Sequence, residues 1–315
     1  MRHQTKLETA IPLQSTAAQE RTLIPFRKYH GLGNDYLIPT NAAYATPDDI
    51  DPTFVKRACD PHYGMGSDGI LYGPYLPQDA YYQRLRINSA KFAFRILNPD
   101  GSEAEKSGNG VRIFCRYLFD RQLVARNEEF ILATLGGPIR CRVEDPECAI
   151  HADMGQLSFD STVIPVAGPP REVLREKLTI DGETLEFCAV TIGNPHCVIP
   201  CPDGVSKEIA LRFGPAVECE PRFPNRTNVQ FIAPVDAHRL RAEIYERGAG
   251  YTLASGTSAC ACAAVAVKLG WCESPVTVQM PGGDLTIQLT KDFHASQCGP
   301  VHHIYDADYF PDTPA

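Results

Sequence analysis

The chain has 315 residues, of which 43% are hydrophobic and 22% are charged. This length accommodates one large domain or two of ordinary size, and the apolar content suffices for a packed core, which excludes wholesale disorder. The formal net charge of −8 argues against a general polyanion-binding protein, so we expect no nucleic-acid partner. No uninterrupted apolar run approaches the length of a membrane span, so we expect no membrane partner.

Residues 1–23 are polar and lack the apolar core of a secretory signal, so we expect a flexible lead-in and a cytoplasmic protein. The 12 cysteines include no Cys-x-x-Cys pair, and several of them stand in apolar runs. This pattern is typical of reduced, buried thiols. We therefore expect neither a disulfide framework nor a metal site.

Strand-like runs alternate with turns rich in Gly, Pro and Asn along most of the chain. Two apolar segments instead predict helices, at residues 108–120 and 256–270, and the second is rich in Ala, a strong helix former. Strands are predicted within residues 25–38, 91–101, 186–196, 228–232 and 241–250.

Both predicted helices begin in the same way. A strand and a polar turn lead to a Ser-Gly pair, at Ser107 in SGNG and at Ser255 in SGTS. The two serines are 148 residues apart (255 − 107), which is close to half the chain. We infer an internal duplication that produces two similar α+β halves, each presenting the N-terminus of a helix.

The N-termini of the two predicted helices suggest a binding site for an anion. A serine before a helix is commonly an N-cap, and this is the ordinary interpretation of Ser107 and Ser255 taken singly. The glycines that follow them permit close approach of a ligand, and free amides with the helix dipole suit an anion. If the halves face each other, a carboxylate bound there would have its α-carbon flanked on both faces. That geometry allows a proton to be removed from one side and returned from the other.

Further polar residues stand in the predicted turns. Each has an ordinary interpretation, as a turn asparagine, a structural histidine or a surface ion pair. Together they supply amide donors and acceptors, one guanidinium and two titratable groups, which suit a zwitterionic amino acid. They are Asn34, Asn98, Asn194 and Asn228 in or beside turns, His196 in GNPH, and Glu246 and Arg247 in YERGAG.

Seven segments between about Phe26 and Asp306 resemble the diaminopimelate epimerase family, which works without pyridoxal phosphate. They are HGLGNDY at 30–36, GMGSDGIL at 64–71, NPDGSEAEKSGNGVR at 98–112, GNPHCV at 193–198, NRTNVQF at 225–231, YERGAGYTLASGTSAC at 245–260 and GPVHHIYD at 299–306.

The resemblance implies an α+β fold of two pseudosymmetric domains, each a mixed β-sheet around a central helix, with the active site in the cleft between them. It implies an N-terminal domain at 24–156, a C-terminal domain at 157–298 and a return segment at 299–315 that packs on the first domain. It also implies an isomerase with no cofactor and a small-molecule amino-acid substrate, in a family that often forms homodimers.

The resemblance assigns roles to individual residues. Ser107 and Ser255 occupy the two catalytic positions, with His196 and Glu246 as the acidic and basic helpers near the reacting centre. Arg247 matches the arginine that pairs with the carboxylate at the distal, non-reacting end of the substrate. The other implied substrate-binding residues are Asn34, Asn98, Gly108, Asn109, Asn194, Asn228, Gly256 and Thr257.

The departure that matters lies at the catalytic pair, because the family uses two cysteines where this chain has Ser107 and Ser255. A thiol has a pKa of about 8.5, which a helix N-terminus lowers, so a useful fraction is thiolate. A serine hydroxyl lies far above that value, and a helix dipole worth about 0.3–1 kcal/mol does not close the gap. Two smaller departures are Gly69, where the family commonly has glutamine, and Tyr251, where it commonly has glutamate.

The sequence leaves three interpretations of the two serines open. The chain could be an engineered Cys→Ser form, or an amino-acid-binding protein without catalysis. It could also be a natural homologue that catalyses one-sided deprotonation, isomerisation or elimination. We favour a natural divergent member over an engineered form, because the polar lead-in and Tyr251 are not obvious engineering choices. The retained Asn98, Asn228 and Arg247 argue against a protein that has lost its function, because these residues serve ligand recognition alone. We therefore predict an amino-acid epimerase or racemase that acts on LL- or meso-diaminopimelate or a related amino acid with a distal α-amino-acid end.

Overall fold

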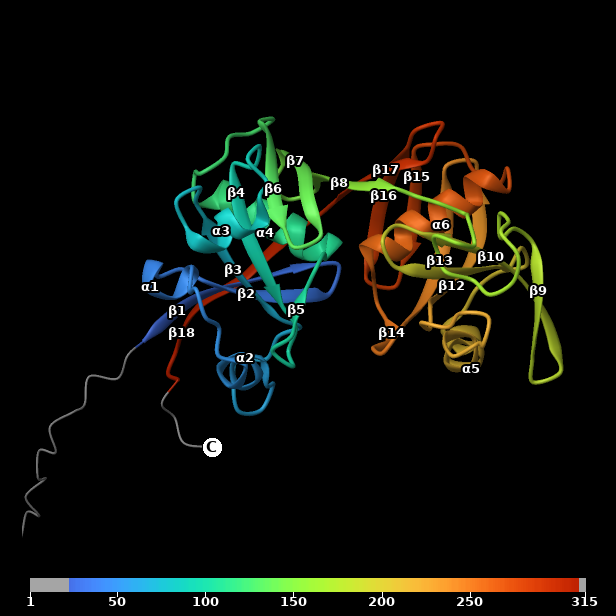
Figure 1. Cartoon of the computed structure of the whole chain (residues 1–315), viewed down its shortest axis with the longest axis horizontal. Helices are drawn as coiled ribbons and strands as arrows, with labels where there is room; N and C mark the ends of the chain where they lie inside the picture. Colours follow the sequence, from blue (N-terminus) through green and yellow to red (C-terminus); the bar gives the residue numbers. More distant parts are fainter. Residues whose placement is uncertain (1–22, 312–315) are drawn as a thin grey trace, which may run out of the picture.

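The computed structural model describes residues 23–311, so the predicted lead-in, apart from its last residue, lies outside the described part of the chain. Figure 1 shows two bodies side by side, joined by extended strands. The first body contains β1 (Ile24–Gly31), β2 (Asn34–Pro39), α1 (Ala42–Ala45), α2 (Pro52–Cys59), β3 (Ile70–Tyr75), α3 (Ala80–Leu85), β4 (Phe92–Leu97), β5 (Glu103–Ala104), α4 (Gly108–Asp120), β6 (Glu129–Thr134), β7 (Gly137–Asp145) and β8 (Ala149–Gln156).

The second body repeats most of this series. It contains β9 (Glu176–Ile180), β10 (Glu183–Thr191), β11 (Pro195–Pro200), α5 (Lys207–Glu218), β12 (Asn228–Asp236), β13 (Arg239–Glu246), β14 (Gly250–Thr252), α6 (Gly256–Lys268), β15 (Val276–Met280), β16 (Gly283–Leu289) and β17 (His294–Gly299), and β18 (His302–Tyr309) follows it.

Strand pairing confirms the duplication. In the first body β4 is antiparallel to β3 and β5 and parallel to β6, and β7 and β8 follow as antiparallel neighbours. In the second body β13 is antiparallel to β12 and β14 and parallel to β15, and β16 and β17 follow in the same way. The fold is therefore α+β, with two pseudosymmetric mixed sheets.

The bodies are connected by the paired strands β8 and β17 and by the strand β18. β8 and β17 pair antiparallel, from His294 opposite Gln156 to Gly299 opposite Ile150. β18 then returns to the first body and pairs antiparallel with β1, from Ile24 opposite Tyr309 to His30 opposite His302. The sheets of the two bodies are thus hydrogen-bonded to each other, which restricts how the facing surfaces are placed.

Each body encloses one central helix. α4 packs against β1, β2, β3, β7 and β8, and Phe114 stacks on Phe94 of β4 with ring centroids 4.4 Å apart. α6 is made largely of Ala and Cys, and its residues 259–266 have no exposed surface. Small side chains let strands approach this helix from several sides. α6 ends two residues before the predicted boundary, because Gly270 has a φ of +73°, which suits a helix C-terminus.

All 12 cysteines are free, and eight of them are buried; the burial agrees with the sequence pattern. Within residues 23–311, every helix is too short or too polar to cross a lipid bilayer.

Candidate active site

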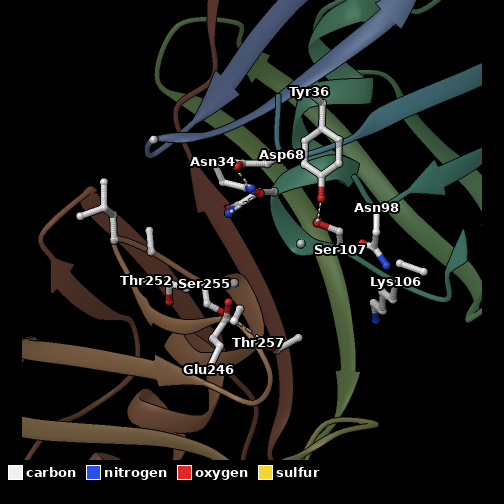
Figure 2. A pocket seen from close by; sticks show the side chains of 18 of the residues that line it. Asn34, Tyr36, Asp68, Asn98, Lys106, Ser107, Glu246, Thr252, Ser255 and Thr257 are labelled. Carbon is white, nitrogen blue, oxygen red and sulfur yellow. Dashed lines mark hydrogen bonds between the residues drawn. The ribbon is translucent and has the colours of Figure 1, made fainter. Parts of the chain in front are cut away.

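The N-termini of α4 and α6 meet at a pocket between the two bodies (Figure 2). Gly108 and Gly256 approach so closely that a Cβ added to Gly108 would lie 3.2 Å from the Cα of Gly256. The pocket has a volume of about 610 Å³. Ten predicted site residues line it: Asn34, Asn98, Ser107, Gly108, Asn109, Asn194, Glu246, Ser255, Gly256 and Thr257.

Ser107 and Ser255 are N-caps and also line the pocket. Ser107 Oγ accepts a hydrogen bond from Gly110 N at 3.1 Å, and Ser255 Oγ accepts one from Ser258 N at 3.4 Å. Each cap uses the third amide of its helix. The two preceding amides of each helix donate no hydrogen bond within residues 23–311, so they remain for a ligand: those of Gly108 and Asn109 in α4, and of Gly256 and Thr257 in α6.

The hydroxyl of Ser107 has a second partner that we did not predict. Tyr36 of β2 donates its phenolic hydrogen to Ser107 Oγ at 3.3 Å, across 71 residues of sequence. The tyrosine is 5% exposed, and burial raises its pKa to about 12. GNDY at 33–36 has the same form as GNPH at 193–196, and Tyr36 and His196 lie in the corresponding strands β2 and β11, but this pattern does not indicate the contact with Ser107.

The hydroxyl of Ser255 faces a carboxyl group. Glu246, at the end of β13, lies beside Ser255 and Thr252, and all three residues line the pocket. Burial raises the pKa of Glu246, and the two hydroxyl partners oppose that shift. A carboxyl group with a raised pKa is better matched to proton transfer near neutral pH than a serine hydroxyl is.

A chain of side-chain hydrogen bonds orders the asparagines on the wall formed by the first body. Arg112 is fully buried and donates from Nη2 to Asn109 Oδ1 at 2.7 Å. Asn109 Nδ2 donates to Asn34 Oδ1 at 3.2 Å, and Asn34 Nδ2 donates to Asp68 Oδ2 at 2.9 Å. Because each amide has a defined partner, the orientation of Asn34 and Asn109 is set before a ligand binds.

Two further charged residues line the pocket and were missed, although both lie in the motif segments. Asp68 belongs to GMGSDGIL and accepts hydrogen bonds from Asn34 and from Asp35 N. Lys106 immediately precedes Ser107, and its Nζ donates to Met154 O of β8 at 2.6 Å. Burial lowers the pKa of Lys106. The pocket therefore offers carboxylates for ammonium groups as well as amides for carboxylates.

His196 does not line the pocket but lies behind Asn194. Its ring is fully buried, with Nε2 3.0 Å from Asn194 Oδ1 and Nδ1 3.1 Å from Gln230 Nε2. Because the Gln230 amide nitrogen can only donate, His196 accepts at Nδ1 and donates from Nε2. Burial lowers the pKa of His196 to about 3, so the ring is neutral. His196, which we expected to be a titratable helper near the reacting centre, instead orients Asn194.

Asn228 and Arg247 also lie outside the pocket lining. Asn228 Nδ2 donates to Pro195 O at 3.1 Å, and its Oδ1 accepts from Arg247 N at 3.0 Å. The exposed Arg247 side chain donates to Asn225 O at 2.9 Å. Asn228 thus ties two rim segments together, and its amide is already hydrogen-bonded.

One of the two smaller departures, Gly69, has a structural explanation. A Cβ at Gly69 would lie 2.3 Å from Leu97 O and 2.7 Å from Cε1 of Tyr36, so no glutamine fits there. Tyr251 does not line the pocket, and its hydroxyl donates to Glu243 Oε2 at 2.7 Å.

Comparison with known proteins identifies the family. The family described as diaminopimelate epimerase matches residues 26–159 and 188–304. Diaminopimelate epimerase 2 of Nostoc sp. is 50% identical over 276 residues, covering 88% of this chain and 92% of that protein. Diaminopimelate epimerase of Moorella thermoacetica is 38% identical, covering 90% and 98% respectively.

Solved structures support the fold. A hydroxyproline epimerase from Agrobacterium vitis has a TM-score of 0.63 at 14% identity, with 94% of each chain covered. A PhzF-family phenazine biosynthesis protein of Bacillus anthracis has a TM-score of 0.62 at 15% identity, covering 91% of this chain and 99% of that one. From its sequence and its fold, the chain belongs to the diaminopimelate epimerase family of amino-acid epimerases.

Proposed function

We propose that the chain inverts the α-carbon of an amino acid with two α-amino-acid ends, with diaminopimelate as the first substrate to test. The observation that carries this proposal is the placement of Ser107 and Ser255 at two converging helix N-termini that line one pocket. An α-carboxylate bound to the free amides of both helices would place its α-carbon between the two hydroxyls.

The charges of the pocket support a zwitterionic substrate. The amides of Gly108, Asn109, Gly256 and Thr257 suit a carboxylate, and the carboxyl groups of Asp68 and Glu246 suit an ammonium group. For the distal end we propose Asn98 and Arg247. Arg247 would exchange its bond to Asn225 O for a bidentate pair with the distal carboxylate.

The chemistry requires no cofactor in this proposal. Glu246 takes a proton through Ser255 as the α-proton leaves, and a proton reaches the opposite face through Ser107. The carbanion that forms between the two steps is stabilised by the helix amides that hold the carboxylate. A serine hydroxyl alone is a poor base, so the carboxyl group behind Ser255 sets the rate of proton removal.

A second function is one-sided chemistry, or binding without efficient epimerisation. It is favoured by the N-cap bonds, which direct an amide hydrogen at each serine oxygen. It is also favoured by the pKa of about 12 of Tyr36, because this phenol cannot act as a base near neutral pH. Under this alternative the enzyme exchanges the α-proton of one stereoisomer and does not invert it.

Proton exchange distinguishes these functions. The purified protein is incubated in D₂O with LL- and with meso-diaminopimelate, and NMR and chiral chromatography follow deuterium incorporation and stereochemistry. Inversion with incorporation supports the epimerase. Incorporation with retention supports one-sided chemistry. Binding in calorimetry without incorporation contradicts a catalytic function on this substrate.

We also propose that the protein works in the cytoplasm. Its 12 cysteines are free, and two of them, Cys148 and Cys219, are exposed. Exposed thiols persist where the compartment keeps them reduced. Fractionation of the source cells with an antibody tests this location.

A further inference from the structure

The two pocket serines have different proton-carrying partners. Counted from the serines, Asn98 in the first half corresponds to Glu246 in the second, since 107 − 98 and 255 − 246 are both 9. The ionisable carboxyl group therefore stands beside Ser255 alone, and its counterpart in the first half is an amide that cannot titrate. The duplication has diverged at the positions that would move protons.

Tyr36 is the ionisable side chain in contact with Ser107. Its hydroxyl donates to Ser107 Oγ at 3.3 Å and lines the pocket, while the ring is buried in the core of the first body (Figure 2). Gly69 makes room for the ring, because a Cβ there would lie 2.7 Å from Cε1 of the tyrosine. The matching position in the second half is His196, which contacts Asn194 and not Ser255. Contact between this position and the serine is thus specific to the first half.

We propose that Tyr36 is a positioning residue that orients the Ser107 hydroxyl and resupplies its proton, so that the two faces of the substrate meet different acid–base pairs. This inference rests on the proposed function and assigns the acid side of the same site.

Each proton has a defined source and destination. Ser255 Oγ takes the α-proton and passes its own hydrogen to the Glu246 carboxylate, while the electron pair of the broken C–H bond stays on the α-carbon. That pair then forms a new C–H bond with the hydroxyl proton of Ser107, which takes the phenolic proton of Tyr36. Water afterwards protonates the tyrosinate and deprotonates Glu246, so the enzyme returns to its starting state.

The resting protonation state of Tyr36 suits it to donate a proton. Burial, with the nearby carboxylates of Asp68, Glu246 and Asp35, raises the pKa of Tyr36, so the phenol starts protonated. From this state, inversion proceeds by proton removal at Ser255 and proton donation at Ser107, and the reverse inversion uses the same groups in exchanged protonation states.

The main test removes the phenolic hydroxyl. Tyr36→Phe keeps the ring, and Tyr29→Phe is a matched control, because Tyr29 pairs with Tyr36 across β1 and β2 and donates to Asp120 away from the pocket. In D₂O we expect Tyr36→Phe to lower inversion at least about tenfold, as expected for a lost general-acid pathway. Exchange with retention, for the isomer whose α-proton faces Ser255, should stay within about threefold, because Glu246 and Ser255 are untouched. Equal losses of inversion and exchange, or unchanged inversion, would overturn the role of Tyr36.

A second measurement needs no turnover. In Ser107→Cys, the Tyr36 hydroxyl would donate to the new thiolate and lower the pKa of the thiol. Adding Tyr36→Phe should raise that pKa by about one unit, which at neutral pH slows alkylation about tenfold.

Alkylation by iodoacetamide is followed against pH at this site by peptide mass spectrometry, with Tyr29→Phe again as control. An unchanged thiol pKa overturns the assignment of Tyr36 even in a protein that epimerises. If the wild-type protein neither exchanges the α-proton nor inverts the substrate, the proposed function is overturned, and the acid role of Tyr36 is overturned with it. In that case a shifted pKa of the thiol would still establish that Tyr36 contacts position 107.

Discussion

Gly108 and Gly256, 148 residues apart in sequence, lie against each other where α4 and α6 begin, and Gln297 of β17 packs beside both. Gln297 Nε2 donates to Gly108 O at 3.0 Å. Its Oε1 would lie 2.6 Å from a Cβ added to Gly256. The glycines therefore permit a spacing between the two helix N-termini that no larger residue allows.

Gly256→Ala tests this spacing. The new methyl group would press on Gln297 and on Gly108, so we expect the free energy of unfolding to fall by about 1–3 kcal/mol, as in other overpacked sites. Urea unfolding measures the loss. In a Gln297→Ala background the same substitution should cost less, since one of the two obstructing groups is gone. Equal costs in the two backgrounds would show that Gln297 does not limit the spacing.

Restoring thiols tests the acid–base argument. The double variant Ser107→Cys with Ser255→Cys should raise epimerisation of diaminopimelate by at least about 10²-fold, because the helix amides are in place and the hydroxyls have unsuitable pKa values. Each single variant should epimerise little, since inversion needs a competent group on both faces. Chiral chromatography of both isomers compares the four proteins. A double variant that binds substrate but remains inactive would locate the divergence elsewhere in the pocket.

Arg247→Met tests the proposed contact with the distal carboxylate. Removing one partner of such a pair commonly costs about 2–5 kcal/mol, so diaminopimelate should bind at least about tenfold more weakly. Alanine lacks a distal carboxylate, and its binding should change far less. Arg226→Met is a matched control at a nearby arginine that pairs with Glu218. Calorimetry that shows the same loss for both ligands would refute the assignment.

His196 predicts a pH dependence of stability. Burial lowers its pKa from 6.5 to about 3, so between these values the unfolded chain binds a proton that the folded chain does not. The contribution of neutral His196 is therefore complete above pH 6.5 and is lost as the pH falls toward 3, with a total on the order of a few kcal/mol.

His196→Gln should flatten this acid limb in urea unfolding between those pH values, although the variant starts less stable at neutral pH. The exposed His238→Gln serves as the control and should leave the limb in place. An acid limb that keeps its wild-type slope in His196→Gln would show that other groups cause it.

Local sequence patterns were enough to predict the duplication, the two central helices and ten of the residues that line the pocket. These features follow from local patterns: apolar periodicity, serine caps and glycine turns act within a few residues of chain. The family followed as well, because its motif segments keep their order along the chain.

Which side chains can exchange protons depends on contacts between distant parts of the chain. Tyr36 and Ser107 meet because the register of β2 and the path of α4 bring together residues 71 positions apart, and no local pattern encodes that contact. Tertiary packing likewise places His196 behind Asn194, where it does not line the pocket. It also places the Arg247 side chain at the rim, where it donates a hydrogen bond to Asn225 O. Sequence motifs specify which groups are present, whereas strand register and burial determine which of them reach the pocket and in which protonation state.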